Sequence, residues 1–415
     1  PRMKKLSRSF SLSLVAAGLL ASGTVSAESL AIINATLHTS SEQGVLEGAS
    51  IVMNDGKITA INPSDFKVDK VIDAQGQIVT PGFIASVNQL GLVEVGAVAG
   101  SRDAGEDKAG IDFDASLAFN PRSSLIAYAR KGGITRDLIT PYGGDSIFAG
   151  LASVVDLSGS FESVNKKQAA LVVHLGERSK GSRAFTLQTL INKLDEHQTK
   201  ASKEAKKDDA KPSAEDTIMA KVLKGDMPLL ISVSRSADIV ELIKVKQQFG
   251  VNIVLNGAQD AVVVKDRIAK AGIPVIISAM DNLPGSFDSL HASLNNAGIL
   301  EKAGVKVLLT VGGDASHNVY QLRYDAGNAV SYGMSQQGAL KAMTSNVADV
   351  FGINAGSLEV GKAADVVMWS NDPFELSSHV NKMFINGVEV STESRQDKLR
   401  ERYTTESNMP RAYTK

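Results

Sequence analysis

Apolar runs of strand length recur through the middle of the chain. They occupy residues 78–86, 132–141, 150–159, 168–177, 227–235, 250–257, 272–279 and 304–314. Runs that are apolar at consecutive positions are typical of strands buried on both faces of a sheet. Between the later runs lie stretches of helical periodicity, such as residues 236–250, which begin at a Ser and end at a Gly. Repeated units of this kind predict an α/β fold with a TIM-like (β/α)8 barrel, although the run at 150–159 also fits a hairpin on the rim.

Both ends of the chain show a different pattern, in which short β-branched runs are separated by tight turns. Residues 30–82 contain Asn-Asp-Gly and Ala-Gln-Gly turns, and Asn386-Gly387 lies between alternating apolar positions. These segments predict a composite β-sandwich domain formed by the N- and C-terminal segments. The predicted organisation is a signal peptide at 1–27, β-sandwich parts at 28–80 and 355–392, a barrel at 81–354 and a polar tail at 393–415.

The N-terminus has the three parts of a secretory signal peptide. Basic residues at 4–8 precede an apolar run at 11–20, and small residues lead up to Ala27. We therefore expect export, a periplasmic location and cleavage after Ala27, which the N-terminal mass of the mature protein tests. The apolar run is too short for a stable membrane span, so none is expected in the mature form.

Composition narrows the classes of partner. A net charge of −1 provides no large field that would attract nucleic acid, so no nucleic-acid partner is expected. The sequence contains no Cys, which excludes disulfides and a Cys nucleophile. The charge run at 199–216 is interpreted as a solvated helix or loop on the barrel exterior.

Three further segments show a resemblance to a known family. They are VIDAQGQIVTPGFI at 71–84, DAGNAVSYGMSQQGALKAMTSNVADVFGI at 325–353 and GSLEVGKAADVVMWSNDPFE at 356–375. Together they resemble the amidohydrolase superfamily, and most closely its imidazolonepropionase-like branch. The resemblance spans roughly residues 30–392 and implies a hydrolase of carbon–nitrogen bonds that uses a divalent metal, usually Zn²⁺, to activate water.

The resemblance also implies a set of metal ligands, and most of them are replaced here. Its His-x-His motif on the first barrel strand falls on Val87 and Gln89, the fifth-strand His on Ser234 and the sixth-strand His on Asn256. A shift of the fifth-strand position would give Ser232, which is also a hydroxyl. Zn²⁺ favours imidazole, thiolate and carboxylate donors. No metal cofactor is therefore expected, although oxygen atoms at such positions leave open a hard ion such as Ca²⁺ or Mg²⁺.

A few candidate catalytic groups remain. Glu177 corresponds to the bridging acid of the fourth strand, with Lys180 nearby, and Asp314 to the Asp of the eighth strand. His317 follows Asp314 and is the best acid–base candidate among the histidines, whereas His174 is interpreted as a core histidine.

Two functions follow from the resemblance. One is a weakly active or inactive hydrolase of small amide-like substrates. The other is a non-catalytic periplasmic protein that binds a ligand or pairs with an active paralogue. A homo-oligomer is also compatible with the sequence, since related barrels often self-associate.

Overall fold

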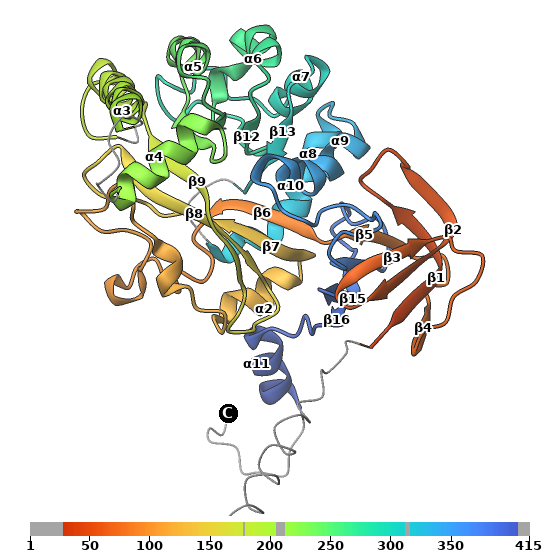
Figure 1. Cartoon of the computed structure of the whole chain (residues 1–415). Helices are drawn as coiled ribbons and strands as arrows, with labels where there is room; N and C mark the ends of the chain where they lie inside the picture. Colours follow the sequence, from red (N-terminus) through yellow and green to blue (C-terminus); the bar gives the residue numbers. More distant parts are fainter. Residues whose placement is uncertain (1–27, 177–178, 205–211, 312–315, 406–415) are drawn as a thin grey trace, which may run out of the picture.

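The computed structural model describes residues 28–176, 179–204, 212–311 and 316–405, and they form two sheets with helices packed around one of them (Figure 1). The predicted signal peptide lies outside these residues. The described part includes no helix that is both long and apolar enough to cross a bilayer.

The first sheet is a nearly closed barrel of eight strands in the order β13-β12-β11-β10-β9-β8-β7-β6. Its strands are β6 (Phe83–Asn88), β7 (Ile134–Ile139), β8 (Phe148–Asp156), β9 (Val164–His174), β10 (Leu229–Val233), β11 (Ile253–Gly257), β12 (Val275–Ile277) and β13 (Val307–Leu309). Each predicted apolar run supplies one of these strands. The two edges approach beyond β13, where Thr310 Oγ1 donates a hydrogen bond to Ser86 O at 2.6 Å.

The predicted (β/α)8 repeat is wrong at β8. This strand pairs antiparallel with both β7 and β9, while the other barrel pairs are parallel. A parallel neighbour requires a crossover of about a dozen residues, usually a helix. The connections at 140–147 and 157–163 are too short for one, so the chain turns back on itself. The run at 150–159 is therefore a full strand of the barrel, reached through hairpin-like connections.

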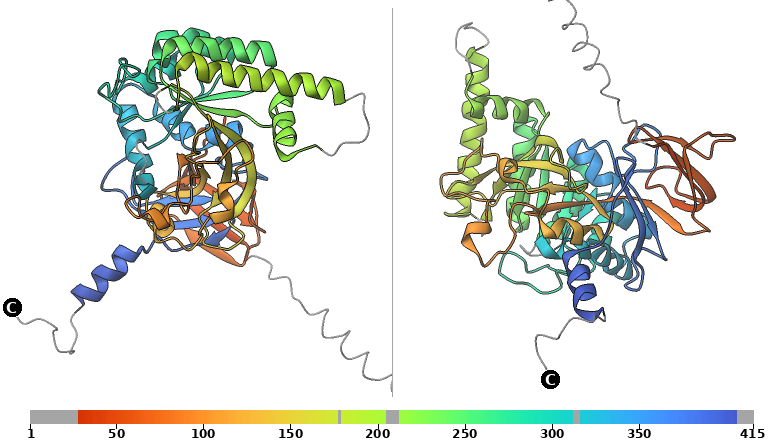
Figure 2. Two further views of the ribbon diagram at one scale, coloured as in Figure 1. Left: turned by 90° about the vertical axis from the view of Figure 1, so that its left-hand side faces the viewer. Right: turned by 90° about the horizontal axis from the view of Figure 1, so that it is seen from below.

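Helices cover the outside of the parallel part of the barrel (Figures 1 and 2). They are α2 (Ser124–Arg130), α3 (Arg183–Glu204), α4 (Ala214–Lys224), α5 (Ser236–Phe249), α6 (Lys265–Ala271), α7 (Asn296–Lys302), α8 (Leu322–Ser331) and α9 (Gln336–Ala342). A further helix, α10 (Ser345–Phe351), packs against the barrel interior. The 3-10 turns are η1 (Ala99–Ser101), η2 (Ala115–Ala118), η4 (Gln259–Val264) and η5 (Ser316–Gln321). As predicted, α5 buries one apolar stripe, including Ile239 and Leu242, and ends at Gly250 with a φ of 70°.

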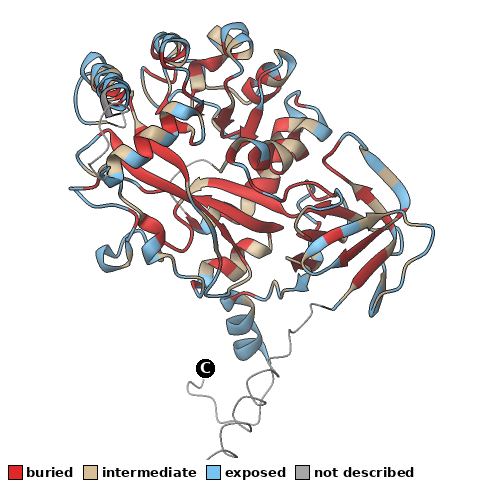
Figure 3. Cartoon of the chain, viewed as in Figure 1, coloured by how far each residue is buried: buried red, intermediate tan, exposed pale blue. Residues whose placement is uncertain are grey.

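The barrel strands are mostly buried (Figure 3), and two apolar layers hold them together. The outer layer lies between the strands and the helices. The inner layer fills the barrel with alternate strand side chains such as Ile84, Leu230 and Val254, and it includes Val347 and Phe351 of α10. Because α10 contributes to the inner layer, apolar side chains pack one end of the barrel, and the cavity described below lies at the other end.

The second sheet is built from both ends of the chain. Its order is β16-β15-β14-β5-β1-β2-β3, and β4 pairs with β1. Its strands are β1 (Leu30–His38), β2 (Val45–Asn54), β3 (Lys57–Ile61), β4 (Lys70–Asp73), β5 (Ile78–Pro81), β14 (Val366–Trp369), β15 (Val380–Ile385) and β16 (Val388–Glu389). The strands form one hydrogen-bonded sheet, where the sequence predicted a two-sheet sandwich. The join between the terminal segments is the antiparallel pairing of β5 with β14.

The segment predicted as a polar tail contains a helix, α11 (Arg395–Thr404). A capping box between Ser394 and Asp397 begins the helix, and Lys131 Nζ lies 2.6 Å from Asp397 Oδ2. The first turn of α11 is therefore fixed to the end of α2, while none of its residues is buried.

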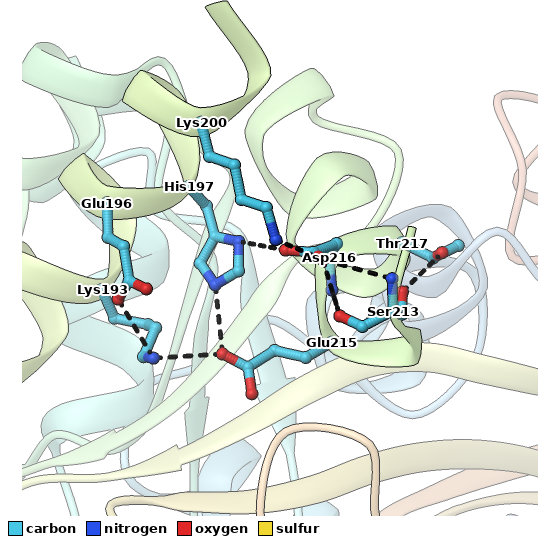
Figure 4. Close-up of polar contacts among 8 residues, drawn as sticks. All are labelled: Lys193, Glu196, His197, Lys200, Ser213, Glu215, Asp216 and Thr217. Carbon is cyan, nitrogen blue, oxygen red and sulfur yellow. Dashed lines mark hydrogen bonds and ion pairs between the residues drawn. The ribbon is translucent and has the colours of Figure 1, made fainter. Parts of the chain in front are cut away.

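Where the structure describes it, the charge run at 199–216 is largely solvated, as predicted, and its charges also join α3 to α4 (Figure 4). His197 is buried and places Nε2 3.1 Å from Glu215 Oε1 and Nδ1 3.2 Å from Asp216 Oδ1. Lys200 Nζ lies 2.6 Å from Asp216 Oδ2, and this hydrogen bond is the largest cause of the lowered pKa of Asp216. Polar contacts thus join the end of α3, including His197 just before the run, to the start of α4.

A buried ion pair connects the barrel to the composite sheet. Arg136 of β7 places Nε 2.6 Å from Oδ2 of Asp365, and the two side chains are only 7% and 1% exposed. The other two guanidinium nitrogens of Arg136, Nη1 and Nη2, donate to Asn165 Oδ1 and Asn386 Oδ1, both at 2.6 Å. A buried ion pair needs such additional hydrogen bonds to offset desolvation.

We predict that Asp365→Ala lowers the free energy of unfolding by about 3–5 kcal/mol, because it leaves a guanidinium buried without its carboxylate. The matched control is Glu389→Ala, which removes an exposed partner of Lys70 and Lys382 and is expected to cost at most about 1 kcal/mol. Chemical denaturation measures both, and equal losses in the two variants would contradict the assignment.

Candidate functional site

A cavity of about 640 Å³ lies at the carboxyl end of the barrel strands. Val87 and Gln89 reach it from the end of β6, His174 from β9, Ser232 from β10 and Asn256 from β11. Ser278 and Thr310, just beyond β12 and β13, also line it, as do Thr140, Gln259 and Asp281. This is the end at which TIM-like barrels place their binding sites.

The structure brings together three of the four replaced ligand positions. Val87, Gln89 and Asn256 line the cavity, as the resemblance predicted, whereas Ser234 does not. The fifth-strand position is Ser232, which pairs in register with Asn256 on one side and His174 on the other. Ser234 lies beyond the end of β10, and its carbonyl accepts a hydrogen bond from Asp260 N at 3.0 Å.

Val87 has an unusual backbone conformation for its side chain. Its φ is 58°, in the left-handed region, which is unfavourable for a β-branched residue. Such strain tends to persist at functional sites, where the surrounding structure determines the backbone. Histidine and asparagine tolerate this region better than valine does, so the backbone at residue 87 suits a His better than the Val that is present.

A chain of hydrogen bonds crosses one wall of the cavity. Asn256 Nδ2 donates to Ser232 Oγ at 3.2 Å, and Ser232 Oγ lies 3.2 Å from His174 Nδ1. The other ring nitrogen, His174 Nε2, lies 3.1 Å from the carbonyl oxygen of Tyr142. His174 thus has hydrogen-bond partners at both ring nitrogens, as a satisfied core histidine would, but it is only half-buried and lines the cavity, so its placement in the core is wrong. Strand alternation alone leaves the inward and outward faces of β9 undecided, and the register with Ser232 decides it.

The described cavity wall does not fit the metal site that the resemblance implies. It has one imidazole, with both nitrogens in hydrogen bonds, and one carboxylate, that of Asp281. The rest of its polar groups are amides, hydroxyls and carbonyls, which are poor donors to Zn²⁺. Within the described ranges, no group of three or more His, Cys, Asp or Glu side chains is placed to hold a metal ion.

The remaining candidate residues have different positions. Glu177 and Asp314 lie outside the described residues. His317 is exposed on η5 and does not line the cavity. Lys180 is exposed and forms an ion pair with Asp145. The structure therefore does not join His317 or Lys180 to the cavity.

Sequence reasoning missed two carboxyl groups, one in the cavity wall and one that interacts with it electrostatically. Asp281 lines the cavity, and its Oδ2 accepts from Gln259 Nε2 at 3.3 Å. Asp325 of α8 is buried, and this burial, aided by the negative charge of Asp281, raises its pKa to about 7. Both lie in segments without a recognisable catalytic motif, so only the spatial arrangement identifies them.

Comparison with known proteins agrees with this architecture. A model described as the amidohydrolase family matches residues 134–390, which is more than half of the chain. The chain belongs to the amidohydrolase family. The imidazolonepropionase-like branch stays a prediction, because the match does not distinguish branches. No curated protein sequence was found to match.

Several solved structures of amidohydrolase-like proteins share the fold. An amidohydrolase from Thermotoga maritima MSB8 has a TM-score of 0.80 and 24% sequence identity, over 87% of this chain and 99% of that one. A triazine hydrolase from Arthobacter aurescens has a TM-score of 0.53 and 18% identity, over 90% and 97%. A prolidase complexed with N-methylphosphonate-L-proline has a TM-score of 0.55 and 14% identity, over 88% and 99%.

We predict that this amidohydrolase-family cavity acquires a zinc site when imidazoles return. The variant Val87→His, Gln89→His, Ser232→His and Asn256→His is expected to bind one equivalent of Zn²⁺, because it places imidazoles at the ends of three strands around one cavity. The matched control carries Ser234→His in place of Ser232→His. It is expected to bind Zn²⁺ at least tenfold more weakly, because Ser234 does not line the cavity. Competition with a chromogenic chelator measures both affinities, and equal affinities would show that the register assignment is wrong.

A third carboxyl group, that of Asp137, is buried on β7. Asp137 Oδ1 accepts from Asn88 Nδ2 at 2.8 Å, and Oδ2 has no hydrogen-bond partner within the described residues. Burial raises the pKa of Asp137 to about 8, and the hydrogen bond from Asn88 only partly opposes this. Between pH 4 and 8 the folded chain therefore keeps a proton that the unfolded chain has lost.

We predict that the free energy of unfolding falls as pH rises through this range, by up to about 1.4 kcal/mol per pH unit, because the folded state binds one proton more than the unfolded state. Asp137→Asn removes the titration, so its unfolding free energy is expected to vary less between pH 5 and 8. The exposed Asp65→Asn is the control and is expected to keep the wild-type slope. Identical slopes for Asp137→Asn and the wild type would contradict the prediction.

Proposed function

We propose that this amidohydrolase-family protein binds a small, neutral, amide-like molecule in the barrel cavity and has little or no metal-dependent hydrolase activity. The observation that supports the proposal is the set of neutral hydrogen-bonding side chains, Gln89, Ser232 and Asn256, at the ends of the barrel strands. An amide ligand presents both a donor and an acceptor, and side-chain amides supply the complementary groups.

The shape and polarity of the cavity suit such a ligand. Its volume of about 640 Å³ lies within the range typical of small-molecule sites. Apolar side chains such as Val172, Leu230 and Val311 form part of the wall, so the polar groups determine orientation while the apolar ones bury ligand surface. The similar structures include a triazine hydrolase and a prolidase, which favours nitrogen-containing small molecules as the ligand class.

The donor chemistry also supports the metal part of the proposal. A full ligand set for structural Zn²⁺ contributes roughly 10–16 kcal/mol at neutral pH, and most of this depends on imidazole, thiolate or carboxylate donors. Gln89 and Asn256 provide neutral amides instead, and Gln89 Nε2 already donates to Thr140 O at 3.3 Å. A water without a metal keeps a pKa near 15.7, so it is a poor nucleophile at neutral pH.

The same observation favours a second candidate function, a non-catalytic binding or partner protein of an active paralogue. A cavity that binds an amide but lacks a metal could present or sense the ligand. Export to the periplasm remains part of both proposals and rests on residues 1–27 alone.

The test combines metal and ligand measurements on the purified protein. After incubation with Zn²⁺ and dialysis, elemental analysis is expected to find less than one equivalent. Cyclic amides and dipeptides, screened by thermal shift and calorimetry, are expected to include a ligand whose affinity falls at least tenfold in Asn256→Leu, since a buried hydrogen bond is lost.

Asn252→Leu is the matched control, because Asn252 precedes the same strand β11 at its opposite end and donates to Gly225 O. It is expected to leave ligand affinity unchanged. Stoichiometric zinc together with amide hydrolysis that disappears in Asp314→Asn would overturn the proposal.

A further inference from the structure

The hydrogen bonds around His174 assign the position of its proton. The carbonyl oxygen of Tyr142 can only accept, so His174 Nε2, 3.1 Å away, is the nitrogen that bears hydrogen. In the neutral ring, Nδ1 is then the acceptor for the hydroxyl of Ser232, 3.2 Å away. Asn256 Nδ2 donates to the same Ser232 oxygen, which leaves the hydroxyl hydrogen for His174.

This arrangement has the parts of an activated nucleophile. A serine hydroxyl lies within hydrogen-bond reach of a histidine base, and a third group orients the base. Here the orienting group is a backbone carbonyl, and the roles of the two ring nitrogens are the reverse of those in the Ser-His-Asp triad. Ser232 and His174 lie opposite each other on the neighbouring strands β10 and β9, so the barrel fixes their separation.

The pair faces a space that an acyl group can enter. Both residues line the cavity of about 640 Å³, next to Val172 and Leu230. Asn256 Nδ2, 3.2 Å from Ser232 Oγ, is an N–H group close to where a carbonyl oxygen would acquire negative charge. Nucleophile, base and a candidate oxyanion donor therefore meet at one wall.

The geometry points to a metal-independent acyl-transfer site, in which Ser232 is the nucleophile and His174 the general base, acting on small carboxylic esters. This inference rests on the proposed binding of a carbonyl compound in the cavity. Ser232 Oγ forms a bond to the carbonyl carbon while its proton passes to His174 Nδ1. The carbon–oxygen bond to the alcohol then breaks, and the alcohol leaves with that proton. Water attacks the acyl-serine in the same way and releases the acid.

We expect esters, and not amides, as substrates because an alkoxide is a better leaving group than an amine anion. Without a metal to polarise the carbonyl, the site has only the Asn256 amide and general-base assistance, which contributes roughly 10²–10⁴-fold. Such a contribution suits activated or small esters better than unstrained amides.

The experiment uses the full-length protein in EDTA with a fluorophosphonate probe and p-nitrophenyl acetate. We expect covalent phosphonylation at Ser232, found by peptide mass mapping, and a burst of nitrophenol. Ser232→Ala is expected to abolish the label and to slow ester hydrolysis by roughly 10²-fold or more. Ser234→Ala is the matched control, since Ser234 lies two residues further along and outside the cavity wall, and it is expected to react as the wild type does.

The variant His174→Asn tests whether His174 acts as a general base or only supports the structure. We expect its labelling rate to fall and the single inflection in the wild-type pH–rate profile to disappear, while thermal unfolding confirms that the variant is folded. A label on another residue, no label, or a burst that survives Ser232→Ala would overturn the inference. If no label forms although amides still bind with Asn256-dependent affinity, the inference fails and the proposed function stands.

Discussion

The ion pair between Arg136 and Asp365 constrains how the two sheets of this protein fit together. Arg136 belongs to the barrel strand β7, and Asp365 directly precedes β14 of the composite sheet. Burying two charges is costly unless every donor and acceptor has a partner. Asn165 and Asn386 supply those partners, and Asn386 lies at the turn between β15 and β16. The network therefore fixes the C-terminal strands against a barrel strand far away in sequence.

The joint between the sheets and the cavity lie at different places in the barrel, and this separation matters for function. Phe351 of α10 packs into the inner apolar layer, whereas the polar cavity wall lies at the carboxyl ends of the strands. Substitutions at the cavity end, where loops follow the strands, disturb less of the apolar packing that stabilises the fold. The cavity can consequently exchange imidazoles for amides and hydroxyls without loss of the barrel.

The sequence predicted the barrel strands well because burial on both faces produces continuous apolar runs. The direction of β8 was not predictable from its own residues, since a run of buried apolar residues such as Ala152 and Val154 fits a parallel and an antiparallel strand equally well. Only the short connections on both sides of it indicate antiparallel pairing. The ion pair of Arg136 could not be predicted from the sequence either. Asp365 lies more than two hundred residues further along the chain, and the pairing depends on how the strands align.

The candidate site shows the same limit on a finer scale. A resemblance locates a ligand position to within about two residues of a strand end. Which of those residues faces the cavity depends on where the strand ends. Ser232 is the last inward-facing residue of β10, and Ser234 has already left the strand. His174 was assigned to the core for the same reason, since a strand pattern does not show which face meets the cavity.

The register of β9 and β10 places residue 232 beside His174, so the side chain at that position determines what His174 contacts. An imidazole at residue 232 would stand beside His174 as a second nitrogen donor, and the two together would favour a metal ion. A serine at that position instead offers a hydroxyl hydrogen to the lone pair of His174 Nδ1 at 3.2 Å. The barrel geometry is unchanged in either case. The identity of one side chain thus decides whether the histidine has a metal or a hydroxyl as its neighbour, and so whether the cavity favours activated water or an activated serine.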